Sequence, residues 1–161
     1  MSQKNFWLMK TEPDVFSFDD LLSRPNQTEP WEGIRNYQAR NFMRDEFKLG
    51  QQVLIYHSNA NPPGIIGIAE VVREAYPDHF ALDPESKYFD PKSAKIGESR
   101  WFMVDVKATH RLRRFLSLDD LRQVPDLQDM PLLMRGQRLS IQPVSDKQWQ
   151  IIWQLGDPEA V

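Results

Sequence analysis

QQVLIYHSNANPPGIIGIAEVVRE (residues 51–74) decides how the chain folds, because it has the pattern of two strands joined by a connection. Residues 51–58 form an apolar run with β-branched and aromatic side chains, and residues 65–74 repeat that character. The intervening NANPPG (59–64) holds two adjacent prolines and a glycine, which favour a loop over a two-residue hairpin turn. The stretch therefore predicts two paired strands, the first of them central to a sheet.

Further strands are predicted on both sides of this pair. FWLMK (6–10) and RWFMVDVKATHRLR (100–113) have strand character, and residues 137–143 contain a shorter strand. Residues 23–30 form a polar loop with proline. Residues 76–99 are a long irregular excursion with three prolines, and its Phe80, Tyr88 and Phe89 favour an ordered segment.

Short helices separate these strands, and each begins at a polar capping residue. The predicted N-caps are Ser17, Asn36, Ser117 and Ser145, and Gly156 is expected to end the last helix. Strands mixed with short helices, without regular βαβ alternation, indicate an α+β protein built on a small mixed barrel of about five strands. Helices are expected to close the ends of this barrel.

Length and composition limit the classes to which the protein can belong. The 161 residues are expected to form one domain over 1–161. The chain has no apolar run of the roughly 18 residues that span a membrane, and its start becomes charged too soon for a secretory signal. These features favour a cytoplasmic protein. The net charge of −3 argues against a protein that coats nucleic acid, but a local basic cleft stays possible.

Motifs for catalysis are missing from the sequence. The three histidines (57, 79 and 110) lack metal-site spacing, and the chain has no cysteine, no phosphate-binding glycine loop and no nucleophile elbow. His57 and Ser58 are neighbours on a predicted strand, so their side chains point to opposite faces. We therefore expect a protein that is not an enzyme.

Seven stretches of the chain, in this order, resemble the EVE domain family. They are FWLMKTEPDVFSFDDL (6–21), WEGIRNYQARNFMRD (31–45), KLGQQVLIYHSN (48–59), GIIGIAEVVREAYPD (64–78), YFDPKS (88–93), RWFMVDV (100–106) and GQRLSIQPVS (136–145). The resemblance implies a PUA-like fold, a twisted and mostly antiparallel β-barrel of about five to six strands with flanking helices. It also implies kinship with YTH domains and other readers of modified bases, and no metal or cofactor.

The stretch WEGIRNYQAR (31–40) suits the recognition of a flipped base. A base needs a flat apolar wall and hydrogen-bonding groups at its edge. Trp31 can provide the wall, Gly33 permits close approach of the backbone, and Asn36 can contact the base edge. Arg35 and Arg40 can pair with phosphates. The alternative is a tryptophan that plugs one end of the barrel, with Asn36 as a plain helix cap.

The resemblance to YTH domains adds residues from other strands to the expected base pocket. Lys10 and Thr11 leave the first strand, His57 to Asn59 end the central strand, and Trp101 precedes a later strand. The complete expected pocket is Lys10, Thr11, Trp31, Gly33, Ile34, Arg35, Asn36, His57, Ser58, Asn59 and Trp101. The third aromatic wall is left open among Tyr37, Tyr56 and Leu139, and Trp7, Trp149 and Trp153 are assigned to packing. Arg40, Arg111 and Arg113 are the expected phosphate contacts.

The predicted function is a non-enzymatic module that binds nucleic acid and takes one modified or flipped base of DNA or RNA into a polar-aromatic pocket. The alternatives are a regulatory domain that binds a small molecule or another protein and, less favoured, a hydrolase. The chain is expected to act as a monomer, away from membranes, in the cytoplasm or, in a eukaryote, the nucleoplasm. A cavity bordered by residues 10–11, 31–36 and 57–59 would support the predicted pocket.

Overall fold

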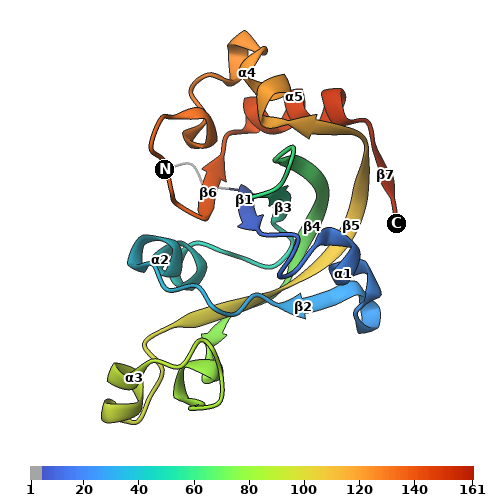
Figure 1. The fold of residues 1–161 in the computed structure, drawn as a ribbon. Coiled ribbons are helices and arrows are strands. Elements are labelled where there is room, and N and C mark those ends of the chain that lie inside the picture. Colours follow the sequence, from blue (N-terminus) through green and yellow to red (C-terminus); the bar gives the residue numbers. More distant parts are fainter. Residues whose placement is uncertain (1–4) are drawn as a thin grey trace.

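One seven-stranded sheet forms the framework of the computed structural model, which describes residues 5–161 (Figure 1). The strands are β1 (Phe6–Thr11), β2 (Thr28–Pro30), β3 (Gln52–His57), β4 (Gly64–Pro77), β5 (Phe102–Ser117), β6 (Ile141–Val144) and β7 (Pro158–Ala160). Their order is β2-β5-β4-β3-β1-β6, and β7 also pairs with β5. The β1–β3 pair is parallel, and the other pairs are antiparallel.

The helices are short. They are α1 (Phe18–Ser23), α2 (Tyr37–Asp45), α3 (Pro91–Ile96), α4 (Leu118–Arg122) and α5 (Asp146–Gly156), with single-turn 3₁₀ helices at Pro25–Gln27, His79–Leu82, Pro125–Leu127 and Pro131–Leu133. All four predicted N-caps, Ser17, Asn36, Ser117 and Ser145, accept a hydrogen bond from a backbone N–H of the first helical turn. No helix among residues 5–161 has both the length and the apolar character to cross a bilayer.

The predicted α+β class is confirmed, but closure of the sheet into a barrel is not. β2 and β6 lie at the two ends of the strand order, and each pairs with one neighbour only. These end strands have three and four residues, too few to complete a ring with each other. The sheet is therefore strongly curved and open, with seven strands where about five to six were predicted.

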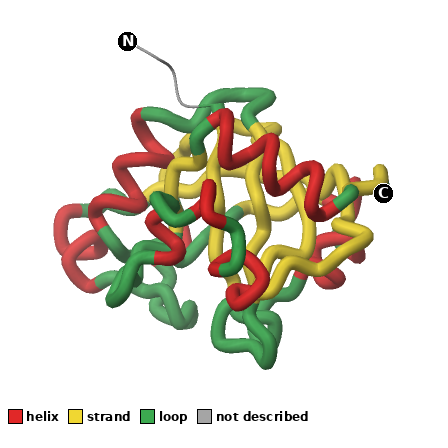
Figure 2. Tube along the Cα trace, turned by 90° about the horizontal axis from the view of Figure 1, so that it is seen from above, coloured by secondary structure: helices red, strands yellow, loops and turns green. Residues whose placement is uncertain are grey.

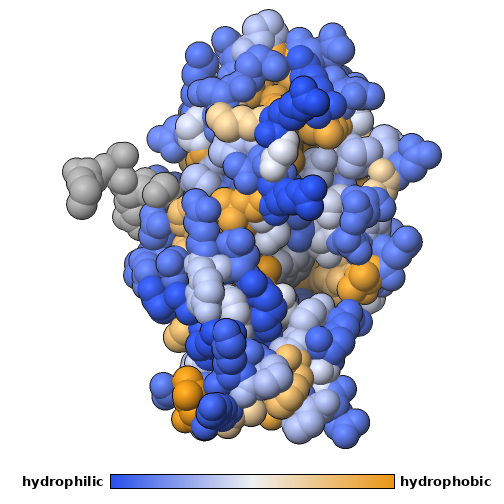
Figure 3. Space-filling view, turned by 60° about the vertical axis from the view of Figure 1, so that its left-hand side comes forward, coloured by the Kyte–Doolittle hydropathy of each residue, from blue (hydrophilic) through white to orange (hydrophobic). Residues whose placement is uncertain are grey.

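Hydrophobic side chains alternate between the two faces of the sheet. On β3, Val53 and Ile55 belong to one cluster of buried residues, and Leu54 and Tyr56 to the other. The first cluster includes residues of α1 and α2, and the second includes residues of α4 and α5. Figure 2 shows the helices around the strands in this arrangement. The face shown in Figure 3 is mainly hydrophilic, with its apolar side chains in separate small patches.

Three predictions of local structure need correction. The segment 23–30, predicted as a polar loop, contains a 3₁₀ turn and β2, because its last residues pair with β5. The excursion 76–99 is less irregular than predicted, since it carries the end of β4 and the helix α3. Gly156 lies inside α5, and Asp157 (φ 47°) forms the left-handed cap. A Cβ at position 156 would lie 2.8 Å from Leu112 Cδ1, so a larger residue there would require the Leu112 side chain to shift.

Asp90 holds the lobe between β4 and β5 together. Its buried carboxylate accepts hydrogen bonds from Arg100 Nε (2.6 Å), Ser93 Oγ (2.7 Å) and Trp101 Nε1 (2.8 Å). These donors, the Arg100 guanidinium first, hold the pKa of Asp90 well below its usual range. The lobe therefore gains stability from the ionised form of Asp90.

We expect Asp90→Asn to lower the free energy of unfolding by about 3 kcal/mol at pH 7, the lower end of the range for breaking a buried ion pair. Because the folded-state pKa is depressed, the stabilisation by Asp90 is present above the unfolded-state value of about 3.9 and is lost as the pH falls below it. The difference between wild type and variant should therefore narrow below about pH 4. Urea denaturation across pH measures this difference.

The matched control is Asp126→Asn, whose carboxylate is mostly exposed and lies 3.9 Å from Lys147 Nζ. Its effect should stay within about 0.5 kcal/mol at every pH. An Asp90→Asn variant that matches this control at pH 7 would contradict the role of Asp90 in the lobe.

Candidate functional site

The loop at residues 31–35 is tied to the excursion by one buried carboxylate, that of Asp78. Asp78 Oδ2 accepts hydrogen bonds from Gly33 N and Arg35 Nη1, both at 2.9 Å, and Asp78 Oδ1 accepts from Phe80 N at 3.0 Å. Arg35 Nη2 donates to the backbone oxygen of Tyr88 at 2.7 Å. Asp78 therefore fixes the position of the loop relative to Tyr88, although 55 residues separate Gly33 from Tyr88 in the chain.

Glycine is required at position 33 for two reasons. Its φ of +84° lies in the left-handed region, and a Cβ there would lie 2.5 Å from Tyr88 Cε1 and Cζ. The ring of Tyr88 therefore packs directly on the backbone of the loop. The sequence reasoning assigned Gly33 to close approach of a ligand, whereas in the structure the close approach is that of the Tyr88 ring.

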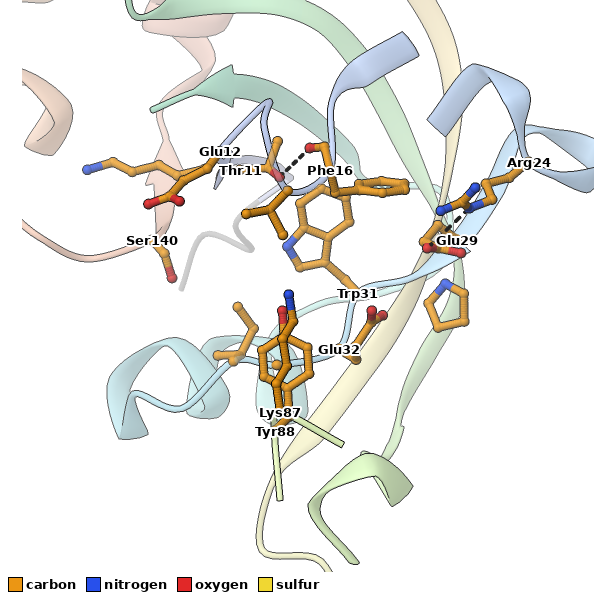
Figure 4. Close-up of a pocket in the computed structure, with 15 residues that line it drawn as sticks. Thr11, Glu12, Phe16, Arg24, Glu29, Trp31, Glu32, Lys87, Tyr88 and Ser140 are labelled. Carbon is orange, nitrogen blue, oxygen red and sulfur yellow. Dashed lines mark hydrogen bonds and ion pairs between the residues drawn. The ribbon is translucent and has the colours of Figure 1, made fainter. Parts of the chain in front are cut away.

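A cavity of about 520 Å³ lies beside this loop (Figure 4). It is lined by Lys10, Thr11, Glu12, Val15, Phe16, Arg24, Glu29, Pro30, Trp31, Glu32, Gly33, Ile34, Lys87, Tyr88 and Ser140. The lining comes from the end of β1, the segments before and after α1, the end of β2, the loop before α2, the excursion and the residue before β6. Its volume falls within the range of about 300–1,000 Å³ typical of sites for small ligands.

Aromatic rings line several sides of the cavity. Phe16 and Trp31 pack edge to face with ring centroids 5.9 Å apart, and Lys87 and Tyr88 reach toward Trp31 from the opposite side (Figure 4). Trp31 is only 7% exposed and is part of the first hydrophobic cluster. The sequence left open whether Trp31 forms a pocket wall or fills the core at one end of the barrel. In the structure the same indole does both, because it packs in the core and forms a cavity wall.

Several polar groups of the lining already have partners within the chain. Thr11 Oγ1 donates to Phe16 O at 2.5 Å, Glu12 accepts from Asn59 Nδ2, and Arg24 Nε lies 3.4 Å from Glu29 Oε2. These interactions fix the rim of the cavity. They also reduce the number of side chains that are available to a ligand.

Several polar groups of the lining have no such partner. No hydrogen bond or ion pair with another residue of the described chain, 5–161, is formed by Trp31 Nε1, the Glu32 carboxylate, the Ser140 hydroxyl or the ammonium groups of Lys10 and Lys87. Burial raises the pKa of Glu32, a hydrogen bond from its own backbone N–H partly opposes this, and the charges of Glu29 and Asp78 raise the pKa further. The lining therefore offers a ligand a donor, an acceptor and a cation.

Five of the predicted pocket residues line the cavity: Lys10, Thr11, Trp31, Gly33 and Ile34. The others, listed here, do not: Arg35, Asn36, His57, Ser58, Asn59 and Trp101. Arg35 is bound to Asp78, Asn36 Oδ1 caps α2, and Trp101 donates to Asp90. These three residues stabilise the loop and the lobe through these hydrogen bonds and do not line the cavity.

The residues that end the central strand also lie outside the cavity. His57 Nε2 accepts a hydrogen bond from Phe18 N at 3.1 Å, and burial lowers the pKa of His57. The backbone N–H of Ser58 donates to Thr11 O at 2.9 Å. Asn59 reaches the cavity only indirectly, through its hydrogen bond to Glu12. The expected border at 57–59 is thus a supporting layer behind residues 11 and 12.

The arginines predicted to contact phosphates are engaged within the chain. Arg40 Nη1 donates to Arg100 O at 3.0 Å, Arg111 pairs with Asp19, and Arg113 Nε lies 3.1 Å from Glu159 Oε2. Lys10 and Lys87 are the lysines at the cavity. Burial lowers the pKa of Lys10.

The sequence reasoning missed the residues of the excursion. None of the three candidates for the third aromatic wall, Tyr37, Tyr56 and Leu139, lines the cavity, whereas Phe16 and Tyr88 do. The available signal was the length of the excursion together with its aromatic residues, which indicated an ordered and functional loop. Nothing in the sequence showed that this loop would meet residues 31–35.

Known proteins and solved structures similar to this chain agree on its family. Thymocyte nuclear protein 1 of Mus musculus is 40% identical over 172 residues, which cover 96% of this chain and 75% of that protein. A solved protein from Leishmania major is 46% identical with a TM-score of 0.87, and the match covers 97% of this chain and 96% of that one. Human THYN1 protein, solved in complex with 5-methylcytosine-containing DNA, is 40% identical with a TM-score of 0.85, over 96% and 98% of the two chains.

The family model of the EVE domain matches residues 5–155, which include every strand from β1 to β6 and every residue that lines the cavity. This match and the 40% identity to thymocyte nuclear protein 1 confirm the resemblance found in the sequence. The chain belongs to the EVE domain family.

Proposed function

We propose that this chain binds DNA that carries a modified base of the 5-methylcytosine kind, and that the base enters the cavity beside Trp31. The observation that carries the proposal is the cavity itself, with its aromatic walls and its unpaired donor, acceptor and cation. The similarity to human THYN1 protein, solved with 5-methylcytosine-containing DNA, supports DNA as the ligand. A base extruded from a helix needs such a pocket for its ring and its edge.

We propose binding without turnover. The Thr11 hydroxyl already donates to Phe16 O, and the similar human THYN1 protein was solved with 5-methylcytosine-containing DNA bound, which supports binding as the role of the site. The module would act in the compartment that holds the DNA, which is the cytoplasm of a bacterium or the nucleoplasm of a eukaryote.

Tyr88 provides the sharpest test of the cavity. Trp31 is less suitable, because replacing this core residue by alanine would cost about 3–5 kcal/mol of stability. Tyr88→Ala removes a half-buried ring while its backbone oxygen stays bound to Arg35. We expect the affinity for a single-stranded oligonucleotide with one 5-methylcytosine to fall by about 1–3 kcal/mol, the range for loss of one stacking surface. Fluorescence anisotropy measures this affinity.

The matched control is Tyr37→Ala. Tyr37 is 51% exposed and stacks on Trp101 with centroids 5.0 Å apart, outside the cavity. The control should bind the oligonucleotide as wild type does. Unchanged binding by a folded Tyr88→Ala variant, or an equal loss in both variants, would contradict the proposed site.

The salt dependence of binding should be shallow. Lys10 and Lys87 lie at the cavity, and the exposed Arg138 lies two residues before Ser140, so two or three cations are placed for phosphates. Each contact on a single strand contributes about −0.7 to the slope of log K against log salt, which gives about −1.4 to −2.1 in total. Lys87→Ala should reduce the slope by about 0.7.

Lys95→Ala is the control, because Lys95 is exposed on α3 and does not line the cavity. It should leave the slope unchanged. A free 5-methylcytosine nucleoside has no phosphate, so its weaker binding should be nearly independent of salt. A steep slope for the oligonucleotide without detectable binding of the nucleoside would indicate contact with the DNA backbone alone and would contradict a base pocket.

A further inference from the structure

Of the three carboxylates that line the cavity, that of Glu32 differs from the other two in having no partner on another residue of the described chain. Glu12 accepts a hydrogen bond from Asn59, and Glu29 is paired with Arg24. Glu32 has no hydrogen bond or ion pair with another residue in the described part of the chain. Its position is fixed by its neighbours, because Trp31 N donates to Val104 O at 2.7 Å and Gly33 N donates to Asp78.

The surroundings of Glu32 make a new hydrogen-bond donor favourable. Burial raises the pKa of Glu32 first, and the carboxylates of Glu29 and Asp78 raise it further, whereas a hydrogen bond from the backbone N–H of Glu32 itself and the charge of Lys87 partly oppose them. A carboxylate that is desolvated and surrounded by like charge is stabilised when an N–H group donates to it.

The edges of the bases differ in how they would meet the Glu32 carboxylate. Cytosine and adenine carry an exocyclic amino donor next to a ring-nitrogen acceptor, whereas thymine presents the O4 acceptor where cytosine has its amino group. An oxygen opposite the Glu32 carboxylate would leave two acceptors facing each other without a proton between them. An amino group would instead satisfy the carboxylate.

We propose that Glu32 is the specificity-determining residue of the cavity, and that its carboxylate accepts a hydrogen bond from the exocyclic amino group of the bound base. The ligand class is therefore an amino-bearing base, and the oxo bases thymine and uracil are rejected. This inference rests on the proposed function. It goes further in naming the group of the base that is read and the side chain that reads it.

The comparison of 5-methylcytosine with thymine isolates this contact, because both bases carry the 5-methyl group. Four single-stranded oligonucleotides of one sequence would carry 5-methylcytosine, thymine, cytosine or uracil at the central position. We expect wild type to bind 5-methylcytosine at least about tenfold more tightly than thymine, the lower part of the range for one specific base contact. The affinity for cytosine should exceed that for uracil by a similar factor. This result would show that the preference depends on the group at position 4 of the pyrimidine ring and not on the methyl group.

The variant Glu32→Gln keeps the size of the side chain and offers both a donor and an acceptor. It should bind 5-methylcytosine and thymine within about twofold of each other, and its thermal unfolding should match wild type because Glu32 stabilises no neighbour. Glu85→Gln is the charge-matched control, exposed on the excursion and outside the cavity. It should keep the tenfold preference.

The outcomes separate the two proposals. Binding of thymine as tight as that of 5-methylcytosine, with weaker binding of cytosine and uracil, would overturn the role of Glu32 and leave the proposed function in place. Equal affinity for all four oligonucleotides would overturn both. A preference that survives in Glu32→Gln, or one that is lost in Glu29→Gln instead, would also overturn that role. Absence of binding to every oligonucleotide would overturn both the proposed function and the inference.

Discussion

The buried carboxylate of Asp78 is the interaction on which the site depends. Asp78 is fully buried and accepts hydrogen bonds from Gly33 N, Arg35 Nη1 and Phe80 N. A buried carboxylate needs such partners, because its desolvation is costly when they are missing. The geometry that satisfies Asp78 is therefore the geometry that brings the loop at 31–35 against the excursion.

Asp78 and Asp90 each stabilise a different part of the excursion. Asp90 gathers Arg100, Ser93 and Trp101, which folds the lobe on itself. Asp78 then connects this lobe to the loop before α2, and its own backbone N–H donates to Trp101 O at 2.9 Å. The two aspartates thus share Trp101 as a neighbour, because the Asp90 carboxylate accepts from its indole N–H and the backbone N–H of Asp78 donates to its backbone oxygen. The cavity wall formed by Tyr88 is held by this network and not by packing alone.

The arginines and the lysines near the cavity have different roles, although both carry a positive charge. The arginines of the predicted cluster are bound to backbone oxygens and carboxylates and act as structural cross-links, as Arg35 and Arg40 show. The lysines beside the cavity remain without ion pairs among the described residues. The planar guanidinium of arginine suits several hydrogen bonds in a fixed geometry, whereas the flexible side chain of lysine can adjust to the position of a phosphate. A small number of lysines is compatible with the net charge of −3.

The sequence by itself determined the elements that depend on local chemistry. Ser17, Asn36, Ser117 and Ser145 cap helices as predicted, since capping is an interaction within three residues. The strand pair around NANPPG and the family were also determined, since each rests on contiguous residues.

The tertiary structure decided what depends on contacts between distant segments. It paired β2 with β5, left the sheet open, and placed Tyr88 on Gly33 and Trp31 in both core and cavity. Those contacts follow from burying Asp78 and the hydrophobic clusters at once, and no local pattern encodes that joint requirement.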